Sequence, residues 1–205
     1  MHVAILTFDG FNELDSLIAF GMINRVKRSG WRATIACAGG TATSMNGLVV
    51  RAQATLADAC AADAVIVGSG VRTREVARDA AIMGALRLDP SRQLVAAQCS
   101  GALILAKLGL LTGQPACTDL TTKPWVQEAG VTVLDQPFHA RGNVATAGGC
   151  LASHYLAAWI IAMAGGEEAA RAVLHYVAPV GEKDAWVARA MGQVAPYLSP
   201  ARVEA

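Results

Sequence analysis

The chain has 205 residues, of which 54% are hydrophobic, 16% are charged and 5% are aromatic. So apolar a composition excludes a disordered chain, and so few aromatic residues argue against a protein that stacks nucleic-acid bases. Seventeen basic and sixteen acidic residues give a net charge of +1, which predicts no attraction to nucleic acid or to a membrane surface.

Apolar runs of strand length alternate along the chain with segments in which apolar residues have helical spacing. The strands expected from these runs are, in chain order, 3–8, 32–38, 49–52 at a sheet edge, 64–67, 93–98 and 143–146. The expected helices are 12–28, one that begins near 72, another that ends at 88, then 101–108, 151–163 and 167–176. Strands that are apolar throughout indicate a parallel sheet covered on both faces, so the predicted fold is a doubly wound α/β domain.

We expect one domain over residues 1–195, because no repeat, low-complexity stretch or linker interrupts this alternation. Residues 196–205 are expected to form a loose tail, since they include Pro196 and Pro200 and have a polar end. The longest apolar stretch of a predicted helix, 156–164, is too short to cross a bilayer, and the first residues do not have the pattern of a signal peptide. These features predict a cytoplasmic protein.

The most informative segment is the junction of a strand and a helix at Cys99. The strand leads directly into the helix, and the residues two before and two after Cys99 are the small Ala97 and Gly101. This pattern is typical of a nucleophile elbow, in which a tight turn exposes the nucleophile at the carboxyl edge of the sheet. Unpaired N–H groups at the start of the following helix favour the thiolate, so we predict that Cys99 is a reactive thiol.

The five cysteines are widely spaced, and no two of them form a Cys-x-x-Cys pair. They are therefore interpreted as free thiols of a reducing compartment, and together with four scattered histidines they show no spacing typical of metal ligands. Cys37, at the end of a strand, is better explained as a buried structural residue. Cys150 opens a helix after Gly148-Gly149 and is the alternative to Cys99 as the reactive thiol, although it lacks the tight strand-to-helix connection.

Two further turns are expected near Cys99, because ligands of open parallel sheets bind at the carboxyl ends of the strands. The first strand leads through Asp9-Gly10 toward Asp15, and the strand over 64–67 ends in Gly68-Ser69-Gly70. If these strands neighbour the strand of Cys99, a carboxylate and a thiol share one pocket. The backbone N–H groups of Gly70 and Ser100 would then donate to a developing anion.

Asp15 has an alternative explanation of equal weight. The spacing Asn12-x-x-Asp15 is that of a capping box, in which the acidic side chain accepts from the backbone N–H of the capping residue. Glu13 is similarly explained as an acidic residue that compensates the dipole at a helix N-terminus. The sequence alone leaves Asp15 open between catalysis and capping.

These motifs, taken in order, resemble the ThiJ/PfpI superfamily, the proteins similar to class I glutamine amidotransferases. The segments that carry the resemblance are residues 8–10, 13–15, 65–70, the Cys99 elbow, 108–113 and 143–149. The resemblance implies a flavodoxin-like fold, a homodimer and no cofactor. Leu14-Asp15 and Cys99-Ser100 are most similar to the isocyanide hydratases and to the ligand-binding domains of some transcription regulators. No helix-turn-helix region follows residue 180, which disfavours a fused regulator.

For an isocyanide hydratase, the resemblance implies that Cys99 attacks the isocyanide carbon and that Asp15 transfers the proton, with an N-substituted formamide as product. The amides of Gly70 and Ser100 would stabilise charge. Asp119 stands where many relatives have a histidine, which counts against the Cys–His branch of the superfamily. Three alternatives remain. They are glyoxalase-like hydration of reactive aldehydes by the same residues, a redox sensor or stress-protective protein in which Cys99 is oxidised to a sulfinate, and a metabolite-binding domain without catalysis.

Overall fold

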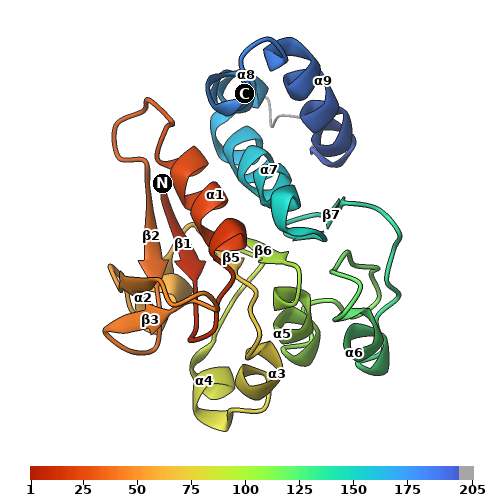
Figure 1. Ribbon diagram of the computed structural model, residues 1–205. Coiled ribbons are helices and arrows are strands. Elements are labelled where there is room, and N and C mark those ends of the chain that lie inside the picture. Colours follow the sequence, from red (N-terminus) through yellow and green to blue (C-terminus); the bar gives the residue numbers. More distant parts are fainter. Residues whose placement is uncertain (199–205) are drawn as a thin grey trace.

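A computed structural model describes residues 1–198 and contains a six-stranded sheet in the order β2-β1-β5-β6-β8-β7 (Figure 1). The parallel strands are β1 (His2–Leu6), β2 (Arg32–Ala36), β5 (Ala64–Val67), β6 (Leu94–Gln98) and β8 (Val144–Ala147). Strand β7 (Phe138–Arg141) runs antiparallel to β8 at one edge. The predicted doubly wound α/β fold is confirmed.

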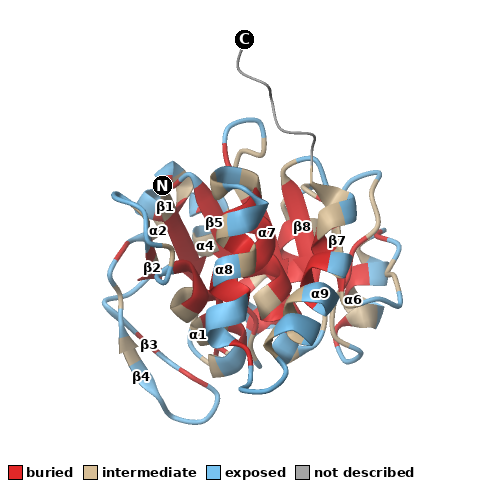
Figure 2. Ribbon diagram, turned by 90° about the horizontal axis from the view of Figure 1, so that it is seen from above, coloured by how far each residue is buried: buried red, intermediate tan, exposed pale blue. Residues whose placement is uncertain are grey.

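Helices cover both faces of the sheet (Figures 1 and 2). One face carries α1 (Glu13–Ile23), α7 (Ser153–Gly165), α8 (Glu167–Val177) and α9 (Lys183–Val194). The other carries α2 (Leu56–Ala61), α3 (Thr73–Val76), α4 (Ala80–Ala85), α5 (Gly101–Lys107) and α6 (Lys123–Glu128). Strand β1 shows why: Val3 and Ile5 belong to the core beneath α1 and α7, whereas Ala4 and Leu6 belong to the opposite core. All four are fully buried, so an apolar strand serves two cores.

Two predicted elements differ from the structure. The segment expected as an edge strand of the sheet is β4 (Val49–Arg51), which pairs antiparallel with β3 (Thr41–Thr43) in a separate two-stranded ribbon. The helix predicted over 12–28 ends at Ile23, because Asn24 bonds across to β2: its side-chain oxygen accepts from the Ala33 N–H at 2.9 Å. The short helices α2 and α6, the helix α9 and the strands β3 and β7 were not predicted.

The β3–β4 ribbon is tied to the loop between β1 and α1. The N–H of Gly10 donates to the carbonyl of Thr43 at 2.7 Å, and the N–H of Met45 donates to the carbonyl of Phe11 at 2.9 Å. Glu13 accepts a hydrogen bond from the Asn46 amide at 3.0 Å. The ribbon therefore fixes the loop that leads into α1, and Glu13 serves as its anchor in addition to compensating the helix dipole.

The C-terminal part of the described chain packs onto the sheet edge. The turn η2 (Ala195–Tyr197) places the Tyr197 ring 5.6 Å from that of Phe138 and 5.1 Å from that of His139. The segment predicted as a tail from residue 196 is thus packed at its beginning, because the Tyr197 ring packs against β7. Residues 199–205 of that segment lie outside the described residues. Within residues 1–198, no helix has both the length and the apolar character needed to cross a membrane.

Candidate active site

The site lies where three neighbouring strands end. Strand β1 pairs with β5 and β5 pairs with β6, with Leu6 opposite Val67 and Val67 opposite Ala97. The turns after these strands therefore meet at one edge, as predicted. Strands β2 and β5 lie on opposite sides of β1, so this edge is also the point where the direction of strand order reverses.

Cys99 occupies the strained position of the elbow between β6 and α5. Its φ angle of 46° makes it the one non-glycine residue with positive φ among residues 1–198. Two hydrogen bonds hold this turn: the Cys99 N–H donates to the Ala147 carbonyl at 2.8 Å, and the Thr118 hydroxyl donates to the Cys99 carbonyl at 2.8 Å. A left-handed conformation at a residue with a Cβ persists only when its surroundings hold it, and such strain gathers at active sites. This geometry supports the predicted nucleophile elbow.

Gly101 is required by the elbow because the chain passes too close to β5 for a side chain. A Cβ at this position would lie 2.9 Å from the Gly68 carbonyl oxygen and closer still to that of Val67. We expect Gly101→Ala to lower the free energy of unfolding by about 3 kcal/mol, measured by urea denaturation. Gly84→Ala is the matched control, since Gly84 is helical and faces open space, and it should raise stability by about 0.5–1 kcal/mol. Equal stability of the two variants would contradict this packing argument.

Asp15 is not a capping residue in the structure. The Asn12 N–H, which the capping box would assign to Asp15, donates to the Ser69 carbonyl at 2.9 Å. Asn12 itself caps α1, because its side-chain oxygen accepts from the Leu14 N–H at 3.1 Å. The Asp15 side chain is fully buried and accepts a hydrogen bond from the Ser69 hydroxyl through Oδ2. Its other oxygen, Oδ1, has no hydrogen-bond partner among residues 1–198. A buried carboxylate oxygen without a partner is costly and indicates a functional role.

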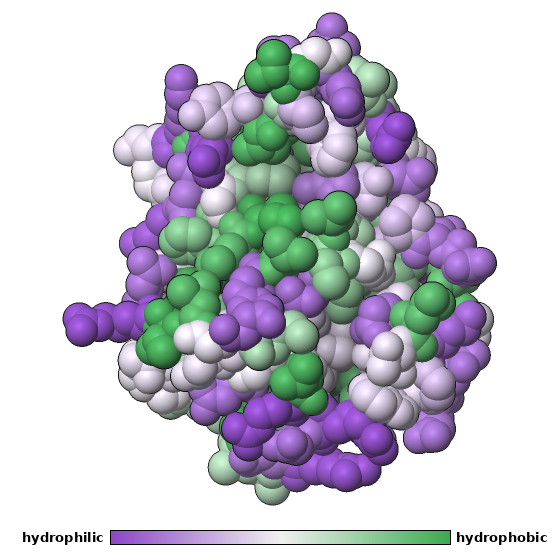
Figure 3. All heavy atoms as spheres, viewed as in Figure 1, coloured by the Kyte–Doolittle hydropathy of each residue, from purple (hydrophilic) through white to green (hydrophobic). Residues whose placement is uncertain are grey.

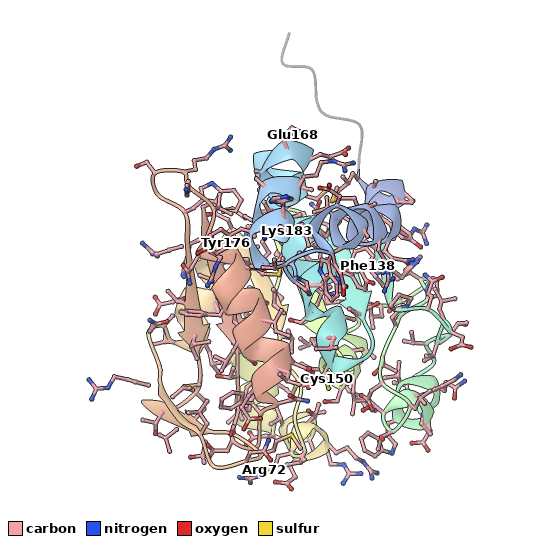
Figure 4. The ribbon with its side chains drawn as sticks, turned by 45° about the horizontal axis from the view of Figure 1, so that its top comes forward. Arg72, Phe138, Cys150, Glu168, Tyr176 and Lys183 are labelled. Carbon is pink, nitrogen blue, oxygen red and sulfur yellow. The ribbon has the colours of Figure 1, made fainter. Side chains whose placement is uncertain are left out.

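The carboxylate of Asp15 and the thiols of Cys99 and Cys150 form one cluster. A carboxylate oxygen and the two sulfurs all lie within 4.8 Å of one another. The Asn12 amide donates to the Cys150 sulfur at 3.1 Å, and the Gln98 amide donates to the Cys99 sulfur at 3.3 Å. Cys150 lies at the foot of α7, beside the first turn of α1 (Figure 4). This donor set could also hold a thiophilic metal ion, which the wide spacing of the three residues in the sequence does not suggest.

Burial governs the proton equilibria of the cluster. It raises the pKa of the Asp15 carboxyl, although the hydrogen bond from Ser69 and the neighbouring thiols of Cys99 and Cys150 oppose this. Burial also raises the pKa of the Cys99 thiol strongly, and the negative charge of Asp15 raises it further. Burial and the Asp15 charge therefore oppose the thiolate that the helix N-terminus is expected to favour, and both favour the protonated thiol. A nearby base must remove this proton when the sulfur attacks.

The two predicted amide donors have different surroundings. The Gly70 N–H donates to the Ser100 hydroxyl oxygen at 3.1 Å, and that hydroxyl also bonds to the Thr73 hydroxyl at 2.8 Å. The Gly70 amide is thus already engaged. The Ser100 N–H makes no hydrogen bond with any other group of residues 1–198, and it follows directly after Cys99. Of the two amides, Ser100 is the better donor to a developing anion.

Several residues around the cluster were missed by the sequence analysis. Ser69 holds Asp15, Gln98 and Asn12 hold the sulfurs, and the Gln98 amide also donates to the Gly149 carbonyl at 2.8 Å. Gln98 carried a usable signal, since a polar residue at the end of an apolar strand and beside the elbow must find buried partners. Asp119 lies in the turn before α6, where its side chain accepts from the Thr122 N–H at 2.9 Å.

An apolar groove runs beside the site, between α1 and the start of α7. It is lined by Leu17, Ile18, Met22, Leu151 and Val177, among others. Figure 3 shows apolar side chains gathered on this face of the molecule. Cys99 itself is only 3% exposed, so a molecule that contacts its sulfur has to be small.

Comparisons with known proteins agree with this fold. The model of the DJ-1/PfpI family matches residues 1–163. The crystal structure of Drosophila melanogaster DJ-1beta has a TM-score of 0.75 and 21% sequence identity, over 86% of this chain and 96% of that one. Oxidized Toxoplasma gondii DJ-1 has a TM-score of 0.74 and 16% identity, over 86% and 97%. A ThiJ/PfpI family protein from Pseudomonas syringae has a TM-score of 0.75 and 19% identity, over 95% and 87%. No curated protein matches the sequence significantly.

Proposed function

The chain belongs to the DJ-1/PfpI family, and from this premise we propose that it is a cysteine-dependent hydratase of small electrophiles, with isocyanides as its substrates. In this proposal Cys99 is the nucleophile and Asp15 is the general acid and base. The observation that carries it is the buried carboxylate of Asp15, which has one oxygen without a partner and lies within 4.8 Å of the Cys99 sulfur.

This juxtaposition suits an isocyanide because its terminal carbon receives both the nucleophile and the proton. As the Cys99 sulfur attacks that carbon and a carbon–sulfur bond forms, Asp15 accepts the thiol proton. Asp15 then gives the proton to the same carbon, which yields a thioimidate. Both transfers end at one atom, so the thiol and the carboxylate have to lie side by side.

The second half of the reaction consumes water. Water adds to the thioimidate carbon, and the Ser100 N–H donates to the oxygen of the tetrahedral intermediate. The carbon–sulfur bond then breaks, the sulfur recovers its proton, and an N-substituted formamide leaves. Because the pKa of the Cys99 thiol is raised, its thiolate is a poor leaving group, so Asp15 must return a proton to the departing sulfur. The sum is one isocyanide and one water to one formamide.

The test is formation of formamides from a panel of isocyanides of increasing size, followed by nuclear magnetic resonance. We expect turnover of slender isocyanides and declining kcat/KM as the substituent grows, because Cys99 is almost fully buried. Glyoxals form the second arm of the panel. Turnover of glyoxals without any formamide from isocyanides would overturn the proposal and assign the same residues to carbonyl hydration.

In this proposal, the partner of the protein is a small-molecule electrophile. The homodimer, the cytoplasmic location and the lack of nucleic-acid and membrane partners stay predictions. A stress-protective role by oxidation of Cys99 to a sulfinate is the second candidate. The observation in its favour is that the Gln98 amide donates to the Cys99 sulfur and that the Asp15 carboxylate lies within 4.8 Å of it, so both stand where they would hold an oxidised form of the sulfur.

A further inference from the structure

The molecule contains a second thiol that the proposed reaction does not use. Cys150 lies within 4.8 Å of the Cys99 sulfur and of the Asp15 carboxylate, although the two cysteines are far apart in the sequence. Cys150 is partly exposed, whereas Cys99 is buried. The other cysteines of the chain, Cys37, Cys60 and Cys117, are not part of this cluster.

We infer that Cys150 and Cys99 form a reversible disulfide, in which Cys150 reacts first with a hydroperoxide and Cys99 resolves the product. Cys150 is the entry thiol because it is the more exposed of the two and because the Asn12 amide donates to its sulfur. A hydrogen bond of this kind stabilises the developing thiolate, and exposure lets the oxidant approach.

The chemistry balances within the cluster. The Cys150 sulfur attacks the terminal oxygen of the hydroperoxide and the O–O bond breaks, while the thiol proton passes through Asp15 to the departing oxygen, which leaves as an alcohol or water. Cys150 is thereby oxidised to a sulfenic acid. The Cys99 sulfur then attacks the Cys150 sulfur, an S–S bond forms and the S–O bond breaks. The hydroxide leaves as water with the Cys99 proton, which Asp15 relays.

The two sulfurs, which lie within 4.8 Å of each other, must still approach to bonding distance. Cys150 follows Gly149, which has a φ angle of 92° and no atom within 4 Å of the place where a Cβ would stand. It also begins a short 3-10 turn and is not part of the long helix α7. The Cys150 side chain can therefore move toward Cys99 by adjusting this turn, whereas Cys99 is held by the elbow.

The disulfide would remove the proposed nucleophile from the reaction and protect it from irreversible oxidation. Formation of the bond does not depend on the proposed hydratase activity, because it needs neither substrate nor turnover. Only its effect on activity rests on that function.

The test exposes the full chain to hydrogen peroxide in the presence of a metal chelator, alkylates the remaining thiols and determines intact mass and non-reduced peptides. We expect a peptide that links Cys99 to Cys150, and its loss on reduction with dithiothreitol. Cys150→Ser should slow oxidation of Cys99 on the order of tenfold. In Cys99→Ser, a dione probe should trap Cys150 as its sulfenic acid.

Cys60→Ser is the matched control, because it removes a partly exposed thiol outside the cluster and should leave the linked peptide unchanged. Oxidation of wild-type Cys99 to a sulfinate without a linked peptide would overturn the inference. So would equally fast oxidation of Cys99 in wild type and in Cys150→Ser. Absence of formamide production, by contrast, would refute the proposed function and leave the disulfide result intact.

Discussion

Cys99→Ala is expected to lower kcat for isocyanide hydration by roughly 10³-fold or more, since no other group can form the covalent intermediate in its place. The elbow positions the Cys99 sulfur beside Asp15 and the Ser100 N–H. An alanine at this position cannot form the covalent intermediate that water attacks. The measurement is formamide production at saturating substrate by wild type and variant.

The fold of Cys99→Ala should persist, which circular dichroism and urea denaturation will check, because alanine fills the same buried position without a new clash. Cys60→Ala provides a matched control with unchanged turnover, as Cys60 lies outside the site. If Cys99→Ala still makes formamides, the nucleophile is a different group, and Cys150 is the next to replace.

Asp15→Asn should have two opposite effects, a loss of turnover and a gain of stability. Turnover should fall about 10²- to 10⁴-fold, because the amide cannot accept the Cys99 proton or return it. The free energy of unfolding at neutral pH should rise by about 1–2 kcal/mol, because the variant removes a buried carboxylate with an unpartnered oxygen. Turnover assays and urea denaturation measure the two effects.

The pH dependence of this gain follows from the direction of the pKa shift. Burial raises the Asp15 pKa above its ordinary 3.8, so the folded state binds a proton more tightly than the unfolded state does. The contribution of Asp15 to wild-type stability is therefore fully present below pH 3.8. It is lost as the pH rises through the raised pKa of the folded state. The advantage of Asp15→Asn should appear over this interval and vanish in acid. A constant advantage at every pH would show that the charge is not its origin.

Glu13→Gln is a control in which the free energy of unfolding should change in the opposite direction. Hydrogen bonds from Ser44 and Asn46 lower the pKa of Glu13, so its carboxylate favours the folded state. Removing this charge should reduce stability at neutral pH, although Glu13 stands only two residues from Asp15. Turnover should respond much less than in Asp15→Asn.

The sequence predicted the elbow because its constraints are local. Cys99 needs small neighbours at two fixed positions and a strand that leads directly into a helix, and consecutive residues determine all of these features. The strands of the sheet were equally visible, since continuous apolar runs identify elements with two buried faces. The partly exposed β7 and β4 have short, mixed patterns, so one was missed and the other was assigned to the wrong sheet.

The remainder of the site depends on contacts between distant segments. Whether Asp15 is a capping residue depends on the Asn12 N–H, which donates to the Ser69 carbonyl from a distant segment of the chain and leaves Asp15 outside a capping box. The thiolate expected of Cys99 rests on the helix N-terminus, which is a local feature, whereas the burial and the Asp15 charge that oppose it arise from the fold. Cys99 follows β6 and Cys150 follows β8, and the two cysteines lie close together because these strands are neighbours in the sheet.

The ties between the β3–β4 ribbon and the loop before α1 have a consequence for local unfolding. Both the Gly10 amide and the Met45 amide are hydrogen-bonded between the two segments, so neither segment can open without releasing the other. The ribbon and the first turn of α1 therefore belong to one cooperative unit in native-state hydrogen exchange. Since Asp15 lies in that turn, the free energy of opening the ribbon also limits how long the proposed general base stays in place.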